Sequence, residues 1–290
     1  MALCTGNVLA ASGTTSGEFL KIPVYSRGSA LGGALVASAN GVGGLYYNPA
    51  GIGRKENAEF ALSHSELYHG LRLENVSLAL PVGNASGFGF AATYLGYGDI
   101  AGYDASGNST GNISASSTVL TFGFSHALSQ RLALGVAVKP IFEHLGEYSA
   151  STVTFDIGMQ ADFDRVSIGA QYANMGGSLT YIADKMPLPT TLRIGLVYRN
   201  PVGGSSISLA ATRENSGTSR LAGGVEYKYS HSMIFRVGYR HLLQGVRGSA
   251  DGLSLGFGLN WQPLMLDYSY RPTGELGGTH QITLSFRLAR

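Results

Sequence analysis

The chain has 290 residues and a formal net charge of +2, and Asp, Glu, Lys and Arg make up only 13% of it. Globular proteins usually carry roughly 25% charged residues, yet the mean hydropathy here is only +0.09. No apolar run reaches the length of about 18 residues that a membrane-spanning helix needs, and the small net charge without a basic cluster argues against nucleic acid as a partner.

Residues 1–11 are predicted to be the remnant of a secretory signal. Val8-Leu9-Ala10 suits a small-residue cleavage site, and because no basic region precedes it, we expect the true start codon to lie upstream. Cys4 is the only cysteine, so a chain without this remnant would suit an oxidising envelope compartment.

Residues 12–56 differ from all that follow and are predicted to form a separate N-terminal unit. Residues 12–22 are polar and rich in glycine before Phe19-Leu20-Lys21-Ile22. In residues 23–56, small residues follow a partly helical spacing from Ser29 to Ala37, and Tyr47-Asn48-Pro49-Ala50-Gly51 comes shortly afterwards.

From residue 57 to residue 290, large apolar residues alternate with small or polar ones. Leu253-Ser-Leu255-Gly-Phe257-Gly-Leu259-Asn-Trp261 shows this pattern most clearly. A period of two is typical of β-strands with one apolar face. We predict about 14 strands, an even number as in bacterial barrels, at residues 57–67, 70–81, 87–97, 115–128, 131–144, 149–163, 165–174, 189–199, 205–213, 219–229, 232–241, 252–261, 263–271 and 280–289.

The links between these strands alternate in length. Links after even-numbered strands are tight, as at Ser129-Gln130, Asp164, Ser230-His231 and Gln262, whereas the links 98–114, 175–188 and 242–251 are long. Outer-membrane barrels have short periplasmic turns and longer outer loops, and strands of about 9–11 residues. The sequence therefore predicts an all-β fold, a membrane-spanning antiparallel β-barrel over residues 57–290 in the bacterial outer membrane, with both termini in the periplasm.

A soluble β-sandwich or adhesin is the alternative fold. Such a protein would also alternate, but its exposed face should carry more Lys and Glu. Here the exposed face would be Leu, Phe, Tyr and Val on almost every strand, which exceeds the apolar patch that a soluble monomer tolerates. This comparison favours the barrel.

The polar face of the strands is rich in glycine, for example at Gly123, Gly135, Gly158, Gly256 and Gly258. Glycine on the inner face of a barrel allows another backbone to approach closely. We therefore interpret residues 12–56 as a periplasmic arm and hatch, with residues 23–56 as a plug in the lumen. An arm that hangs in the periplasm is the alternative.

Charged residues also fall on inner positions. Alternate residues of a strand share a face, and counting along each strand in this way places further charges inside at Asp156, Asp162 and Arg193. Late in the barrel it gives a lumenal polar cluster, which comprises Glu226, Lys228, Arg236, Arg240, Asp267 and Arg287. On the lipid face a Lys or Arg would cost about 2–4 kcal/mol at the midplane. A ligand or ion site is one interpretation, and we favour the other, an ion-pair network that braces the wall or holds the plug.

No catalytic, cofactor or metal motif is found. The pairs Ser63-His64, Ser125-His126 and Ser230-His231 are chain neighbours, which a strand directs to opposite faces, so none forms a relay by itself. The histidines show no metal-ligand spacing such as His-x-x-x-His. We expect no cofactor, no metal and no enzymatic activity.

The chain resembles the PorV/PorQ family. The N-terminal likeness lies in Phe19-Leu20-Lys21-Ile22, Arg27, Gly32-Gly33-Ala34 and Tyr47-Asn48-Pro49-Ala50-Gly51. Further matches are Asn174-Met175-Gly176, Leu192-Arg193-Ile194-Gly195, Gly224-Val225-Glu226-Tyr227 and Asp267-Tyr268-Ser269-Tyr270, so that the likeness covers roughly residues 16–288. That family is similar in architecture to FadL-type barrels of 14 strands, in which an Asn-Pro-Ala segment belongs to the hatch. The resemblance thus implies that Asn48, Pro49, Ala50 and Gly51 form a hatch motif.

The resemblance implies a component of protein secretion or surface attachment of the type IX kind, which binds exported proteins or secretion components. The alternative is a FadL-like uptake channel for long-chain fatty acids or other hydrophobic small molecules. Its candidate ligand contacts are Leu179, Tyr181, Ile182 and Met186, which serve equally well in a loop folded on itself. A purely structural barrel is the third hypothesis. In each case outer-membrane lipid surrounds the chain, and nucleic acid is not a partner.

Overall fold

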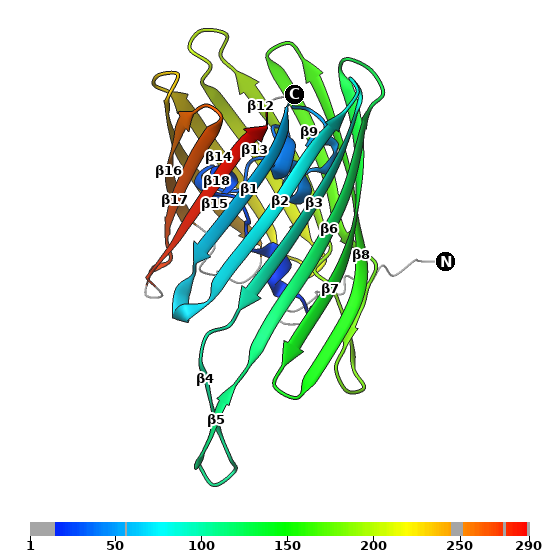
Figure 1. Ribbon diagram of the computed structural model, residues 1–290, viewed down its shortest axis with the longest axis vertical. Coiled ribbons are helices and arrows are strands. Elements are labelled where there is room, and N and C mark those ends of the chain that lie inside the picture. Colours follow the sequence, from blue (N-terminus) through cyan, green and yellow to red (C-terminus); the bar gives the residue numbers. More distant parts are fainter. Residues whose placement is uncertain (1–14, 56, 245–251, 275–276, 289–290) are drawn as a thin grey trace, which may run out of the picture.

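The computed structural model describes residues 15–55, 57–244, 252–274 and 277–288. Most of them form a closed antiparallel barrel of fourteen strands (Figure 1). The strands are β1 (Ala58–Glu66), β2 (Arg72–Val82), β3 (Ser86–Gly96), β6 (Ala115–Ala127), β7 (Leu132–Leu145), β8 (Tyr148–Phe163), β9 (Val166–Met175), β12 (Thr191–Arg199), β13 (Ser206–Glu214), β14 (Ser219–Lys228), β15 (Met233–Gln244), β16 (Gly252–Trp261), β17 (Leu264–Pro272) and β18 (Gly278–Leu288).

The first and last strands close the barrel. β1 pairs with β18 from Ala58 opposite Leu288 to Glu66 opposite His280. Closure pairs the backbone groups of both edge strands, which a bilayer requires of any sheet that spans it. The predicted all-β barrel is confirmed, and the sandwich alternative is excluded. The largest difference in a strand boundary is at β15, which ends at Gln244 and not at residue 241, because the pairing with β14 continues past the predicted end.

The two faces of the wall follow the alternation of the sequence. On β7, Ala133 and Ala137 face the lumen and are buried, whereas Leu134 and Val136 are exposed on the outside. Aromatic residues pair across strands on that outer face, and the rings of Phe88 and Phe124 lie 5.0 Å apart. Cross-strand aromatic pairs contribute roughly 0.2–1 kcal/mol each, and their exposure outside the wall suits contact with lipid.

Two of the long links contain short hairpins that the sequence did not predict. The link 98–114 contains β4 (Ile100–Tyr103) and β5 (Ser109–Ile113), which project beyond the barrel (Figure 1). The link 175–188 contains β10 (Ser178–Thr180) and β11 (Lys185–Pro187). We call the end of the barrel with these long links the outer end, since outer-membrane barrels carry their longer loops on the cell surface.

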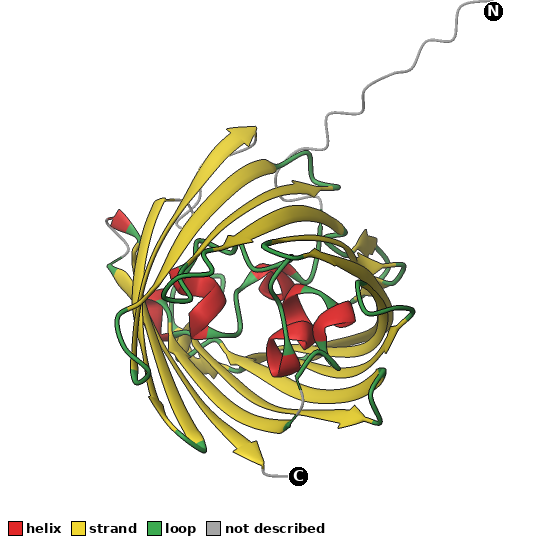
Figure 2. Cartoon of the chain, turned by 90° about the horizontal axis from the view of Figure 1, so that it is seen from above, coloured by secondary structure: helices red, strands yellow, loops and turns green. Residues whose placement is uncertain are grey.

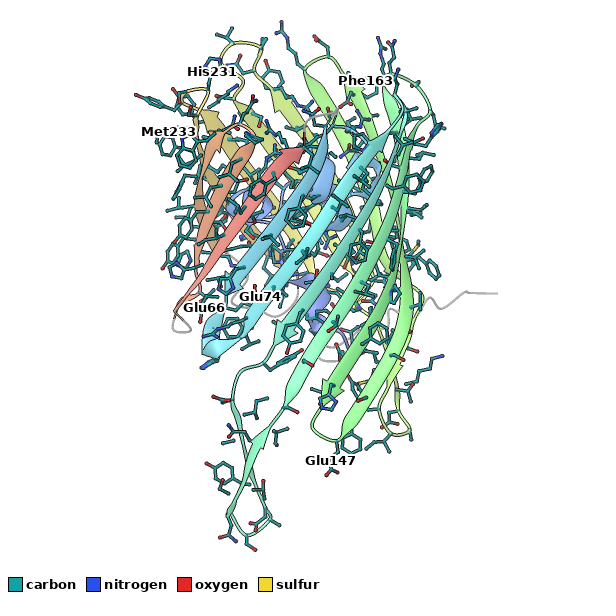
Figure 3. The ribbon with its side chains drawn as sticks, in the orientation of Figure 1. Glu66, Glu74, Glu147, Phe163, His231 and Met233 are labelled. Carbon is teal, nitrogen blue, oxygen red and sulfur yellow. The ribbon has the colours of Figure 1, made fainter. Side chains whose placement is uncertain are left out.

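Figure 3 shows the two ends of the barrel through labelled side chains. Glu66 and Glu74, on either side of the β1–β2 turn, and Glu147, between β7 and β8, mark the outer end. Phe163 and His231, beside tight turns, lie at the opposite end. The turn at η4 (Tyr68–Gly70) also belongs to the outer end.

Residues 15–55 lie inside the barrel, where Figure 2 shows short helices surrounded by the strands. Their elements are η1 (Glu18–Lys21), α1 (Ser26–Ala30), η2 (Gly41–Gly43), α2 (Gly44–Tyr47) and η3 (Pro49–Gly51). The partly helical spacing from Ser29 to Ala37 gives only the end of α1 followed by turns. We call residues 15–55 the inner segment. Its apolar side chains, such as Leu31, Leu35 and Ile52, are at most 2% exposed and form much of the core.

Candidate functional site

The segment Asn48–Gly51 is buried where the inner segment meets β7 and β8. The Asn48 amide donates hydrogen bonds of 2.9 Å to the carbonyl oxygens of Val36 and Met159. Its Oδ1 accepts a hydrogen bond of 3.2 Å from the backbone N–H of Ala50, so that Asn48 caps η3. One side chain thus joins two turns of the inner segment to the wall.

Two glycines of the wall allow this approach. A Cβ atom at Gly135 would lie 2.2 Å from the carbonyl carbon of Pro49, and one at Gly158 would lie 2.0 Å from Oδ1 of Asn48. Distances this short are repulsive, so a side chain at either position would have to displace the inner segment.

The inner segment extends from the outer end of the lumen to the opposite end. At the outer end, the N–H of Ser16 donates a 3.0 Å hydrogen bond to the carbonyl of Pro187, and Lys21 forms a 3.1 Å ion pair with Glu214. At the other end, the N–H of Gly53 donates to Ser125 Oγ at 2.8 Å. These contacts hold Ser16 and Lys21 inside the barrel near its outer end, and the division of residues 12–56 into a periplasmic arm and a hatch stays a prediction. Residues 1–11, the expected signal remnant, lie outside the described residues.

Three of the six residues in the predicted lumenal polar cluster lie together. Arg236 donates a 2.7 Å hydrogen bond to Glu226 and a 2.6 Å hydrogen bond to Asp267. Arg27 of α1 donates to the same oxygen of Glu226 at 2.9 Å. The Arg236 side chain is only 1% exposed. This network fixes the inner segment to β14, β15 and β17.

The other three predicted members do not join that network of ion pairs. Arg240 donates a 2.8 Å hydrogen bond to the carbonyl of Gly32 and so contacts the inner segment closer to the outer end. Arg287 contacts the sulfur of Met265 at 3.8 Å. Lys228 is exposed near the tight β12–β13 turn, because β14 ends there and leaves its side chain at the rim. An inward-facing position on a strand therefore does not by itself predict which charged residues contact one another.

The earlier lumenal charges have partners of their own. Asp156 forms a 2.6 Å ion pair with Lys139, and Asp162 pairs with Arg54 of the inner segment. Arg193 donates a 2.7 Å hydrogen bond to Gln171 and lies 5.3 Å from the centre of the Tyr46 ring.

A cavity of about 360 Å³ lies between the inner segment and the outer end of the wall. Five of its lining side chains are cationic, namely Lys21, Arg193, Arg220, Arg240 and Arg271. Its two acidic residues are Glu18 and Glu214. Aromatic and aliphatic side chains supply the rest of the surface, among them Tyr46, Tyr47, Tyr68, Leu71, Leu95 and Tyr97. We call this space the outer cavity.

A second cavity of about 210 Å³ lies beside the central ion-pair network. Glu226, Arg236, Asp267 and Arg287 line it from the wall, and Arg27 lines it from the inner segment. Its charges are largely paired with one another, which supports the interpretation of this cluster as a structural brace.

The four predicted apolar ligand contacts differ in burial and line neither of the two cavities described above. Leu179 is 0% exposed within the core. The Tyr181 hydroxyl donates a hydrogen bond to Glu143 of β7. Ile182 is 77% exposed, and Met186 is 36% exposed. In the same link the N–H of Ser178 donates a 3.3 Å hydrogen bond to Thr152 Oγ1 of β8, and the role of these four residues as ligand contacts stays a prediction.

Two of the three serine–histidine pairs lie on strands with their members on opposite faces, and Ser230-His231 lies in the β14–β15 turn. Ser63 and Ser125 are buried in the lumen, whereas His64 contacts Glu74 and His126 contacts Ser86 on the outside. Across the described ranges, no group of three His, Cys, Asp or Glu side chains could hold a metal ion. No helix in the same ranges is both long enough and apolar enough to cross a membrane.

Several residues of the lumen were not predicted as site residues from the sequence. Lys139 and Arg271 have inner parity, and Arg271 shares it with Asp267 on the same strand, so this signal was available. Arg27, Tyr46 and Tyr47 lie in the inner segment. Because this segment contains no strand, the sequence has no alternation that predicts where their side chains point.

The comparisons with known proteins agree with this architecture. Residues 43–286 match the family described as type IX secretion system membrane protein PorP/SprF. No curated protein matches the sequence. The fold is similar to the toluene transporter TbuX of Ralstonia pickettii, with TM-score 0.67, 15% identity, and coverage of 93% of this chain and 100% of that one.

Two further solved structures share the fold. A FadL homologue of Pseudomonas aeruginosa has TM-score 0.66 and 12% identity, with coverage of 92% of this chain and 99% of that one. The toluene transporter TodX of Pseudomonas putida has TM-score 0.63 and 16% identity, with coverage of 91% and 97%. Identities this low show a common fold only.

The family match covers most of the chain, and the fold agrees with it. The type IX likeness and the FadL-like architecture are confirmed, although the matching family is PorP/SprF and the narrower likeness to PorV/PorQ is not shown. The chain is an outer-membrane β-barrel and belongs to the PorP/SprF family of type IX secretion system membrane proteins.

Proposed function

We propose that this chain is a non-enzymatic component of type IX protein secretion or surface attachment, which binds exported proteins at its outer end. The occupied lumen carries this proposal. The inner segment lies within the barrel and is tied to the wall through Arg27, Asn48 and Arg54. A polypeptide could not pass such a lumen without displacing the segment, so binding at the surface is the simpler role.

In this proposal the inner segment is a hatch, and Asn48–Gly51 is its motif. The bonds of Asn48 to Val36 and Met159 support that assignment, because they hold one turn of the segment against the wall. A hatch secured by buried hydrogen bonds stays closed in the absence of a partner that provides compensating interactions.

The contact surface for exported proteins is the raised side of the outer end. β8 has 16 residues whereas β12 has 9, so the wall is taller on one side. The β4–β5 hairpin adds exposed apolar side chains to that side, with Tyr103 67% exposed and Ile113 43% exposed. Exposed aromatic residues on a protruding hairpin are typical of protein interfaces.

A comparison of surface and culture-fluid proteins between the wild type and a clean deletion strain tests this function. We expect a set of exported proteins to disappear from the surface and to accumulate in the periplasm. Complementation with the intact gene is the control and should restore them. An unchanged exported set would contradict the proposal.

An uptake channel for hydrophobic compounds is the second candidate, and the outer cavity favours it. The similar structures TbuX and TodX are toluene transporters. The aromatic lining of the outer cavity, with Tyr46, Tyr68 and Tyr97, offers comparable apolar surface. Slower entry of labelled toluene into the deletion strain, with an unchanged exported set, would support this function over secretion.

A further inference from the structure

The outer cavity has more positive than negative side chains. Its two acidic residues, Glu18 and Glu214, are both engaged by Lys21, and Glu214 is also engaged by Arg220. Arg193, Arg240 and Arg271 remain as further cations around the same space. Arg240 donates to the carbonyl of Gly32, and its positive charge repels that of Arg271. An anion in the cavity would relieve this repulsion.

Arg271 is the cation best placed to receive such an anion. Its guanidinium forms no hydrogen bond or ion pair with any residue that the structure describes, and the Nε atom is buried without a partner although the residue as a whole is only partly buried. A buried N–H that lacks a partner is costly, and a carboxylate is the group that matches the planar fork of a guanidinium. A carboxylate in the cavity would satisfy this N–H and the positive charge of Arg271.

Tyr47 supplies a second polar group at the same cavity. Its side chain is 2% exposed, and its hydroxyl has no hydrogen-bond partner among the described residues. Tyr68, Leu71 and Leu95 form apolar wall around these groups. The combination suits a carboxylate joined to an apolar or aromatic body.

The lining of the cavity suits an end of a chain. The inner segment contributes Phe19, Ile22 and Tyr47 to it, and the wall contributes Leu71, Leu95 and Arg271 among others. The backbone of a polypeptide carries a carboxylate only at its C-terminus, and that group matches the guanidinium of Arg271. Capture of a C-terminal carboxylate is a known mode of peptide recognition.

We propose that the outer cavity binds the C-terminal carboxylate of an exported protein, with Arg271 as the residue that contacts it. This inference rests on the proposed function in secretion. The tyrosine and threonine hydroxyls of the lining, including Thr191 and Thr212, suit the polar backbone of a peptide better than a saturated acyl chain. The last side chain of the exported protein would lie against Leu71 and Leu95.

Binding of a short probe to the full chain in nanodiscs of neutral lipid tests this proposal. The probe is N-acetyl-tyrosyl-phenylalanine, used as the free acid and as the C-terminal amide, which differ only in the terminal charge. We expect the acid to bind at least about tenfold more tightly than the amide, which corresponds to the free energy of one hydrogen bond to a charged group. Arg271→Gln should reduce the affinity for the acid to that for the amide, and Arg271→Lys should restore part of it.

Arg213→Gln is the matched control, since Arg213 lies on β13 with an exposed guanidinium that bonds Ser219 and Gln244 and does not line the cavity. It should leave both affinities unchanged. Equal binding of acid and amide by the unmodified chain would overturn the proposal without reliance on any variant.

Decanoate and decanol, tested in the same way, separate a chain end from a small acid. Binding of decanoate without binding of the peptide acid would overturn the proposal and favour uptake. The proposed role in secretion is tested separately, by comparing an Arg271→Gln strain with the deletion strain. If the deletion strain loses its exported proteins and the Arg271→Gln strain keeps them, only the role of the cavity is refuted.

Discussion

Arg27 of the inner segment donates a 2.9 Å hydrogen bond to Glu226 of β14, across a separation of 199 positions in the sequence. Arg236 donates to the same carboxylate at 2.7 Å and also reaches Asp267. The carboxylate of Glu226 therefore links the inner segment to the wall. The positive charge of Arg236 compensates the negative charges of the two wall carboxylates, Glu226 and Asp267.

The two arginines should differ in their effect on stability. Arg236→Met leaves Glu226 and Asp267 with less compensation in a buried place, and removal of one partner from a buried pair costs about 3–5 kcal/mol. Arg27→Met should cost less, because the Arg27 side chain is 25% exposed and Glu226 keeps Arg236. Urea unfolding in lipid vesicles measures both, with Arg213→Met as a surface control. Equal losses would contradict the assigned network.

Gly158 should not accept even a methyl group. An added Cβ would lie 2.0 Å from Asn48 Oδ1, so Gly158→Ala must displace the hatch motif and should destabilise the barrel by about 1–3 kcal/mol. Gly223→Ala is the control, since its Cβ would lie 3.3 Å from the flexible side chain of Leu209 and in ordinary contact, 3.9 Å, with the carbonyl oxygen of Ser208. The measurement is the temperature at which the folded form is lost on a gel. Similar melting of both variants would argue against a fixed inner segment.

Deletion of residues 23–56 should raise single-channel conductance in planar bilayers, because the lumen would lose the segment that occupies it. The shift in gel mobility on heating is the control for folding of the shortened barrel. Arg27→Met in the intact chain is a milder second variant, which should increase brief openings. Unchanged conductance of a folded deletion variant would rule out the hatch.

The tip of the β4–β5 hairpin should lose order in acid. Backbone N–H groups of Asn108 and Ser106 donate to Asp104, and together with the Asn108 side chain they lower the pKa of this carboxyl below its ordinary value. A lowered pKa in the folded state means that this stabilisation is present above the ordinary pKa and is lost as pH falls through the lowered one. Amide exchange at the tip should quicken over that range, and Asp104→Asn should remove the pH dependence.

The sequence by itself determined the barrel. A period of two fixes which residues of a strand share a face, and on β7 it correctly divides Ala133 and Ala137 from Leu134 and Val136. Tight links such as Asp164 and Gln262 separated the strands, so that their number and most boundaries followed from local chemistry. The same parity placed Glu226, Arg236 and Asp267 on the inside.

Only the tertiary structure decided how the lumen is used. The position of Arg240 and Lys228 on their strands predicts that both face inward, but it gives neither their height in the barrel nor their neighbours. In the structure neither residue joins the network around Arg236. The inner segment has no periodicity, so the contacts of Arg27 and Tyr47 depend on how the closed barrel packs around it. Pairings across such long sequence separations arise from the packing of the whole chain, which no local pattern encodes.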